Sequence, residues 1–142
     1  MWQFEHTETT RATPEQLWAR YADPAAWPAW DDGTESVSVE GPMAVGTRGR
    51  LKPKGGPTTT FEFTQVEPGR GFTDVTRLPL ARLPLARLEF AHRIDPDENG
   101  TRFTHRVTIT GPLSPLFARV VGRDVAAGLP GAMRALARLA EQ

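Results

Sequence analysis

The stretch that decides the fold is RFTHRVTITGPLSPLFARVV, residues 102–121, where one hydrophobic pattern gives way to another. Up to Thr110, apolar and polar residues alternate, which is typical of a strand with one buried face. Gly111-Pro112 interrupts this pattern, and Ser114-Pro115 has the residue types that cap and begin a helix. Apolar residues then follow helical spacing to about Glu141. One long helix cannot bury its apolar stripe alone, so we expect it to lie in the concave face of a curved sheet.

The same long helix contains a second proline. Pro130 lies between Gly128 and Gly131 and lacks the N–H that a helix interior uses. We therefore expect a kink at Pro130.

The chain before this stretch supplies the rest of the predicted sheet. Trp2 to Thr10 alternates as a strand does, and Thr13-Pro14-Glu15-Gln16 is a capping-box helix start. Asp23-Pro24 begins a second short helical piece. From Glu35 onward, short alternating segments separated by Gly- and Pro-containing turns predict an antiparallel meander. The predicted order is strand, two short helices, six strands and long helix, in one α+β domain over residues 1–142.

Composition narrows the classes of function. The chain carries 17 basic and 17 acidic residues, so its formal net charge is zero, which argues against bulk binding to nucleic acid or an anionic membrane. The absence of cysteine excludes disulfides, thiol nucleophiles and Cys-type metal centres. No apolar run is long enough to span a bilayer, and no signal-peptide pattern opens the chain. We expect a cytoplasmic protein with no membrane insertion and no cofactor.

Short motifs in order along the whole chain resemble the SRPBCC superfamily, in the branch labelled polyketide cyclase/dehydrase-like. This superfamily has the helix-grip fold of START domains and the birch pollen allergen. The matching motifs are Phe4-Glu5-His6-Thr7, Thr13-Pro14-Glu15-Gln16-Leu17-Trp18, Asp23-Pro24 through Trp27-Pro28-Ala29-Trp30, Gly41-Pro42 through Gly46-Thr47, Phe90-Ala91-His92, Gly100-Thr101 through Thr104-His105-Arg106, and Gly111-Pro112-Leu113.

The resemblance implies a curved seven-stranded antiparallel sheet wrapped around the C-terminal helix. It also implies that the first strand lies beside the last, and the last beside the sixth. A tunnel-like cavity between sheet and helix is implied as well, with its mouth bordered by hairpin loops and the start of the helix. Many relatives bind apolar or aromatic small molecules.

All three histidines lie in phase with apolar neighbours on predicted strands. This parity places His6, His92 and His105 on the core face. If the turn between the last two strands is Asp97 to Gly100, His92 pairs directly with His105. Three interpretations stay open: contact with a ligand or proton transfer to it, a zinc site, or core histidines satisfied by their neighbours. His92 and His105 are the candidate catalytic residues.

The other candidate ligand contacts are inward-facing aromatic and aliphatic residues of the predicted sheet, hairpin tip and helix start. Asp74 is ambiguous, because Val75 next to it favours the opposite face, and a solvated Asp74 on the outer face is the favoured interpretation. Trp27 and Trp30 are expected in the core. The full predicted ligand-binding set is His6, Phe61, Phe63, Phe90, His92, Phe103, His105, Val107, Leu80, Leu85, Phe117 and Val121.

A five-residue unit, Arg-Leu-Pro-Leu-Ala, is written twice over residues 77–86. Five extra residues inside a strand would turn every later side chain to the wrong face, so we expect a loop insertion at a hairpin tip near the mouth. The insertion is either a neutral extension or a lid in which Leu80, Leu83 and Leu85 fold over the cavity or meet a second subunit.

Three hypotheses on function follow. The first is a protein that binds an apolar, aromatic or polyketide-like small molecule between sheet and helix. The second is a polyketide cyclase, aromatase or dehydratase that uses the cavity histidines for proton transfer. The third is a stress-related or co-chaperone-like domain that works through its surface. The sequence leaves open the ligand, whether any reaction is catalysed and whether the chain forms a homodimer.

Overall fold

The computed structural model describes residues 1–80 and 83–142, without the side chains of residues 79, 80, 83 and 84. The predicted order of elements is confirmed, with the second short helix in 3-10 geometry. The elements are β1 (Trp2–Thr10), α1 (Pro14–Tyr21), η1 (Pro24–Ala29), β2 (Thr34–Val39), β3 (Arg48–Pro53), β4 (Thr59–Glu67), β5 (Gly71–Leu80), β6 (Leu83–Asp97), β7 (Gly100–Thr110), α2 (Ser114–Phe117), the π-helical turn η2 (Ala118–Gly122) and α3 (Arg123–Ala140).

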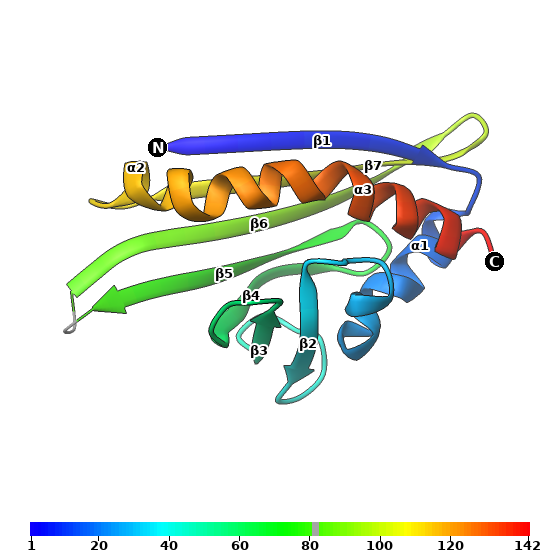
Figure 1. The fold of residues 1–142 in the computed structure, drawn as a ribbon. Coiled ribbons are helices and arrows are strands. Elements are labelled where there is room, and N and C mark those ends of the chain that lie inside the picture. Colours follow the sequence, from blue (N-terminus) through cyan, green and yellow to red (C-terminus); the bar gives the residue numbers. More distant parts are fainter. Residues whose placement is uncertain (81–82) are drawn as a thin grey trace.

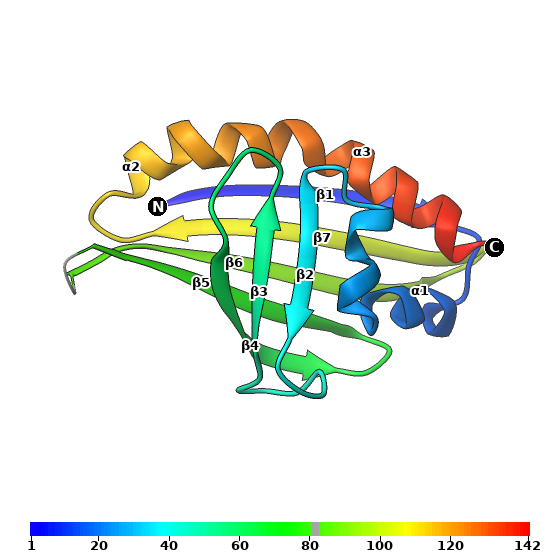
Figure 2. The ribbon, with the colours of Figure 1, turned by 60° about the horizontal axis from the view of Figure 1, so that its bottom comes forward.

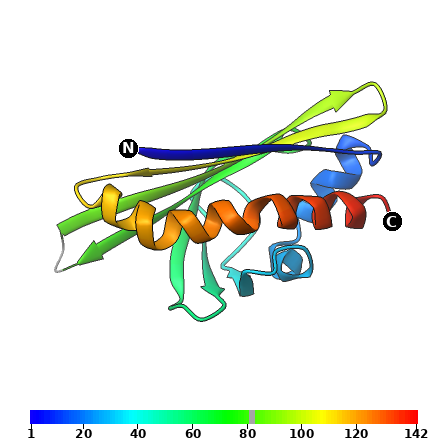
Figure 3. The same ribbon diagram turned by 45° about the horizontal axis from the view of Figure 1, so that its top comes forward.

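The strands form one seven-stranded antiparallel sheet in the order β1-β7-β6-β5-β4-β3-β2. The first strand therefore lies beside the last, as the resemblance implied. The sheet curves, and α3 runs along its concave side (Figure 1, Figure 2). Figure 3 shows α2 and α3 following one another along the same side, with α1 close to the C-terminal end of α3. The predicted α+β helix-grip fold is confirmed.

Two apolar clusters fill the space between the sheet and the helices. The larger cluster lies under the C-terminal half of α3 and includes Tyr21 from α1 and Met133 and Leu136 from α3. The smaller cluster lies under α2, η2 and the start of α3, and Ile109 is its most deeply buried member. Leu129 packs against both clusters, so it marks the place where one gives way to the other.

One of the two predicted helix caps is present in the structure, and the other is not. Thr13 caps α1 in a capping box with Gln16, as predicted. Ser114 was expected to cap the long helix, but it is the first residue of α2 and makes no side-chain capping bond. Its backbone N–H donates to the Gly111 carbonyl, at 3.1 Å.

The long helix contains a change of helical geometry that the sequence did not predict, and the kink at Pro130 stays a prediction. Pro130 lies inside α3, which continues through it from Arg123 to Ala140. The change in helical geometry comes earlier, at the π-helical turn η2. There Gly122 lies against the Trp2 ring of β1, and a Cβ at this position would approach the ring to 3.1 Å.

The repeated five-residue unit was expected to be a loop, but strand pairing continues through its described residues up to Leu80 and Leu83. The register runs from Arg77 opposite Arg87 to Leu80 opposite Leu83, with one shift after Leu78. The described residues of the first copy lie on β5 and those of the second copy lie on β6. Pro79 and Pro84 are opposite one another, so the two missing N–H groups fall at one position of the ladder. Residues 81–82 and the side chains of Leu80 and Leu83, part of the predicted lid, lie outside the described residues.

Candidate ligand-contacting site

The sheet register brings the three histidines into one row. His105 on β7 is opposite His6 on β1 and opposite His92 on β6. The turn pairs Asp97 with Gly100, so the predicted direct pairing of His92 with His105 is confirmed. Phe72 on β5 continues the row beyond His92. The row crosses four strands on the concave face, which is the face that packs against α3.

His105 is the buried centre of this row. Its side chain is 3% exposed, and its Nε2 atom lies 2.6 Å from the Tyr21 hydroxyl. Burial lowers the pKa of His105 well below its usual value, and His92 and His6 nearby lower it further. Burial also raises the pKa of Tyr21. Both groups are therefore neutral near pH 7 and share one hydrogen bond.

His92 is held by its strand neighbour Phe72. Its Nδ1 atom donates to the Phe72 carbonyl at 3.2 Å, and the two rings stack with centroids 3.9 Å apart. The His92 ring meets that of His105 edge-on, at 4.5 Å between centroids. Burial lowers the pKa of His92 to about 4. Two neutral imidazoles thus touch inside an apolar interior, and the side chain of His92 remains partly exposed.

His6 has a different environment from the other two histidines. Its Nε2 atom lies 2.8 Å from Glu8, and both side chains keep about a quarter of their surface exposed. This pair belongs to the edge strand β1, so solvent reaches it. Among the described residues, no three His, Asp or Glu side chains are arranged to hold a metal ion.

Asp74 lies on the concave face, which corrects the interpretation of a solvated outer residue. It is opposite Phe63 on β4 and Phe90 on β6, and it is 7% exposed. Val75 takes the convex face instead, where its register partners Glu62 and Glu89 flank it and it is 1% exposed. Burial raises the pKa of Asp74 to about 8, so the carboxyl is protonated near pH 7.

The remaining predicted contacts divide into two groups. Fully buried side chains belong to the apolar clusters, whereas a second group keeps part of its surface exposed along the start of the long helix. Leu80 lies outside the residues whose side chains are described. The buried group is Phe61, Phe63, Phe103 and Val107, and the partly exposed group is Phe90, Leu85, Phe117 and Val121.

The sequence did not predict that two further residues of this interior, Tyr21 and Trp30, lie close to His105. Tyr21 was visible only as part of the apolar face of α1, because its contact with His105 depends on how that helix packs. Trp30 lies 6.2 Å from His105 between ring centroids, and its Nε1 is buried without a hydrogen-bond partner among the described residues. The expected core positions of Trp27 and Trp30 are confirmed.

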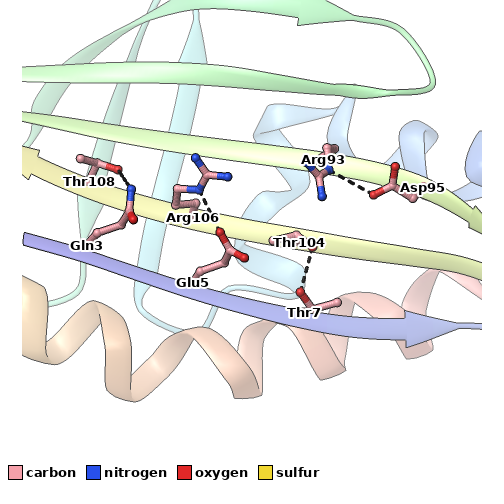
Figure 4. Close-up of polar contacts among 8 residues, drawn as sticks. All are labelled: Gln3, Glu5, Thr7, Arg93, Asp95, Thr104, Arg106 and Thr108. Carbon is pink, nitrogen blue, oxygen red and sulfur yellow. Dashed lines mark hydrogen bonds and ion pairs between the residues drawn. The ribbon is translucent and has the colours of Figure 1, made fainter.

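The convex face carries polar ladders rather than an apolar site. Figure 4 shows Arg106 paired with Glu5 and Thr7 with Thr104 across neighbouring strands, and Arg93 paired with Asp95 along β6. A recess of about 180 Å³ lies here. Arg93 and Arg106 line it but are already paired with carboxylates, so they offer little free charge to an anion. The ligand cavity implied on the concave side stays a prediction.

The chain belongs to the family described as polyketide cyclase / dehydrase and lipid transport, whose model matches residues 1–141. None of the curated proteins matches the chain. No helix in the described ranges is long and apolar enough to cross a membrane.

Solved structures with low sequence identity share the fold. Protein MLL2253 from Mesorhizobium loti is 20% identical, with a TM-score of 0.73 over 99% of this chain and 97% of that one. Ara h 8.0201 is 16% identical, with a TM-score of 0.73 over 98% and 97% of the two chains. DynU16, from the dynemicin biosynthetic locus, is 18% identical, with a TM-score of 0.71 over 99% of this chain and 47% of that one.

Proposed function

We propose that this protein binds an apolar, aromatic or polyketide-like small molecule between the sheet and the N-terminal half of the long helix. The observation that carries the proposal is incomplete burial at this place. Phe90 and His92 on β6, and Val125 and Leu129 on α3, belong to inward-facing sets yet remain partly exposed. An apolar ligand would cover this surface. Membership of a family described in part by lipid transport supports the same function.

The electrostatic state of the interior suits an uncharged ligand. Burial keeps His92 and His105 neutral as bases and Asp74 neutral as an acid near pH 7. These groups offer hydrogen bonds without a net charge, so an apolar molecule that carries oxygen atoms would meet no unpaired ion.

Tryptophan fluorescence tests the proposal, because Trp2 lies at the partly exposed end, against Gly122. Titration with a naphthol and, separately, with oleate should give a saturable change in emission and a rise in the melting temperature. A Trp2→Phe variant is the control, since it should lose most of the emission change while it keeps the thermal shift. If neither probe gives saturable binding or a thermal shift, the proposal is wrong.

A second candidate function is polyketide cyclisation or dehydration, and the contact between His92 and His105 favours it. Two neutral imidazoles 4.5 Å apart, one of them bonded to a tyrosine hydroxyl, can accept and return a proton. His92→Gln and His105→Gln should each slow cyclisation of a model poly-β-ketone by about a hundredfold or more. His6→Gln, at the solvent-exposed edge, is the matched control and should keep most of the rate. Unchanged rates in the first two variants would remove both histidines from the chemistry.

A further inference from the structure

Asp74 and Thr76 form a polar seam between the two apolar clusters. They lie two residues apart on β5 and face the same side of the sheet. Asp74 is flanked by Phe63 and Phe90, and Thr76 by Phe61 and Leu88. Phe61 and Phe63 belong to the larger cluster, whereas Leu88 belongs to the smaller one and Phe90 packs against it.

Among the residues that the structure describes, neither side chain of the seam has a hydrogen-bond partner, and the polar atoms of both keep some access to solvent. Asp74 and Thr76 are each 7% exposed, and neither makes a side-chain hydrogen bond with any described residue. Buried polar groups are usually paired, because leaving one unpaired costs free energy. Two such groups on one strand, facing the same way, point to a partner that the protein itself does not supply.

The surroundings of the seam define what that partner is. Phe90 beside Asp74 is partly exposed, and Leu129, which packs against both clusters, supplies apolar surface from α3. The nearest titratable groups on the same face are His92, His105 and Tyr21, all neutral near pH 7. His6 and Glu8 also face this side, but they lie three strands away on β1 and pair with each other. The charged residues of α3, namely Arg123, Asp124, Arg134 and Arg138, are exposed. An ionic headgroup would therefore find no counter-ion here, whereas an uncharged oxygen would find hydrogen-bond donors.

We propose that Asp74 and Thr76 recognise the carbonyl oxygen of an otherwise apolar ketone or aldehyde that binds over Phe90. This inference rests on the proposed binding function and names its ligand class. The protonated carboxyl of Asp74 donates one hydrogen bond, and the Thr76 hydroxyl donates a second. Phe90 and Leu129 contact the hydrocarbon part of the ligand.

The test compares two probes of nearly the same shape, methyl naphthyl ketone and isopropylnaphthalene, in which a methyl group replaces the carbonyl oxygen. Binding is measured by tryptophan fluorescence and calorimetry. The wild-type protein should prefer the ketone by about tenfold or more near pH 6, the value of one to two well-made hydrogen bonds. Above about pH 9 the Asp74 carboxylate can no longer donate, and the preference should fall to within about twofold, as in Asp74→Leu.

Three variants and a matched control show which side chains cause the preference for the ketone over the hydrocarbon. Asp74→Leu should reduce it to within about twofold while retaining affinity for the hydrocarbon probe. Asp74→Asn keeps a donor that does not titrate, so its preference should persist at high pH. Thr76→Val should reduce the preference in part. Thr73→Val, on the same strand but on the convex face, should leave it unchanged.

The outcomes separate this inference from the proposed function. If neither probe binds to the wild-type protein, the proposed function fails and this inference fails with it. If both probes bind and Asp74→Leu keeps the full preference for the ketone, only this inference is overturned. Thermal unfolding confirms that each variant is folded, and Asp74→Leu should melt at or above the wild-type temperature because it replaces a largely buried carboxyl with an apolar side chain.

Discussion

At the scale of single residues, burial shifts the pKa values of acids and bases in opposite directions within one interior. The pKa of Asp74 is raised to about 8, whereas that of His92 is lowered to about 4 and that of His105 lies well below its usual value. Each of these groups is consequently neutral near pH 7. The folded chain holds a proton on Asp74 that the unfolded chain has lost, and it lacks protons on both histidines that the unfolded chain gains below about pH 6.5.

These shifts predict a maximum of stability near pH 6.5. Between about pH 4 and 6.5 the unfolded chain binds protons on two histidines, whereas the folded chain binds one on Asp74. The unfolded chain therefore binds one more proton than the folded chain, so the free energy of unfolding rises with pH. Between about pH 6.5 and 8 only the proton on Asp74 differs, and stability falls by about 1 kcal/mol per pH unit. Urea unfolding across this range measures the profile.

Two variants check the origin of the falling limb. Asp74→Asn cannot ionise, so its stability should stay level from about pH 6.5 to 8. Asp32→Asn changes an exposed aspartate and should keep the wild-type profile. A falling limb that persists unchanged in Asp74→Asn would show that another group causes it.

At the scale of elements, the β5–β6 hairpin and the long helix meet at the base of the repeated unit. The Leu113 N–H donates to the Leu85 carbonyl at 3.0 Å, which joins the start of α2 to β6. The hairpin continues beyond this contact as a two-stranded ribbon (Figure 1). Since the register from Gly71 to Arg77 is set by pairing with residues 87–93, the ribbon lies outside the part of the sheet that carries the site.

Deleting residues 82–86 should therefore leave the fold intact. The remaining copy keeps Leu-Ala before Arg87 and leaves four residues to connect Arg77 with Arg87. The melting temperature should change by no more than about 3 °C. Removing residues 72–76 deletes the same number from inside β5, shifts the later side chains of that strand to the opposite face and should prevent folding.

Ligand exchange separates the two interpretations of the ribbon. If the ribbon acts as a lid, the shortened protein should release a naphthol faster, as measured by stopped-flow fluorescence. An unchanged release rate in a folded, shortened protein would show that the ribbon is a neutral extension.

At the scale of the whole molecule, the sequence predicts the features that depend on the hydrophobic period within a strand or helix and on the order of these elements along the chain. Alternation through Phe103, His105 and Val107 placed one face of β7 against the core, and the short turn at Asp97 fixed the pairing of His105 with His92. The face of a strand and the register of a hairpin depend on residues close together in the sequence, so they can be predicted from the pattern of residue types. The order of elements followed from the change of period at Gly111.

Features that depend on packing between elements could not be predicted from the hydrophobic pattern of the sequence. The contact of Tyr21 with His105 arises from the way α1 closes one end of the sheet. The face of Asp74 was misjudged because its neighbour Val75 is the more apolar residue, and yet Val75 is covered on the convex side. Asp74 is a polar residue on the inward face, so a prediction from the rule that apolar residues face inward fails at this position.

The paired arrangement of the two copies has a consequence for how this chain varies through descent. When a copying error doubles a segment at the tip of a hairpin, the new copy can pair with the original copy on the other arm. Such an error lengthens the molecule at its tip and spares the alternation on which the interior depends. Lineages that gain or lose this unit would keep the same inward face of the sheet, and natural variation in length should collect here rather than elsewhere in the sheet.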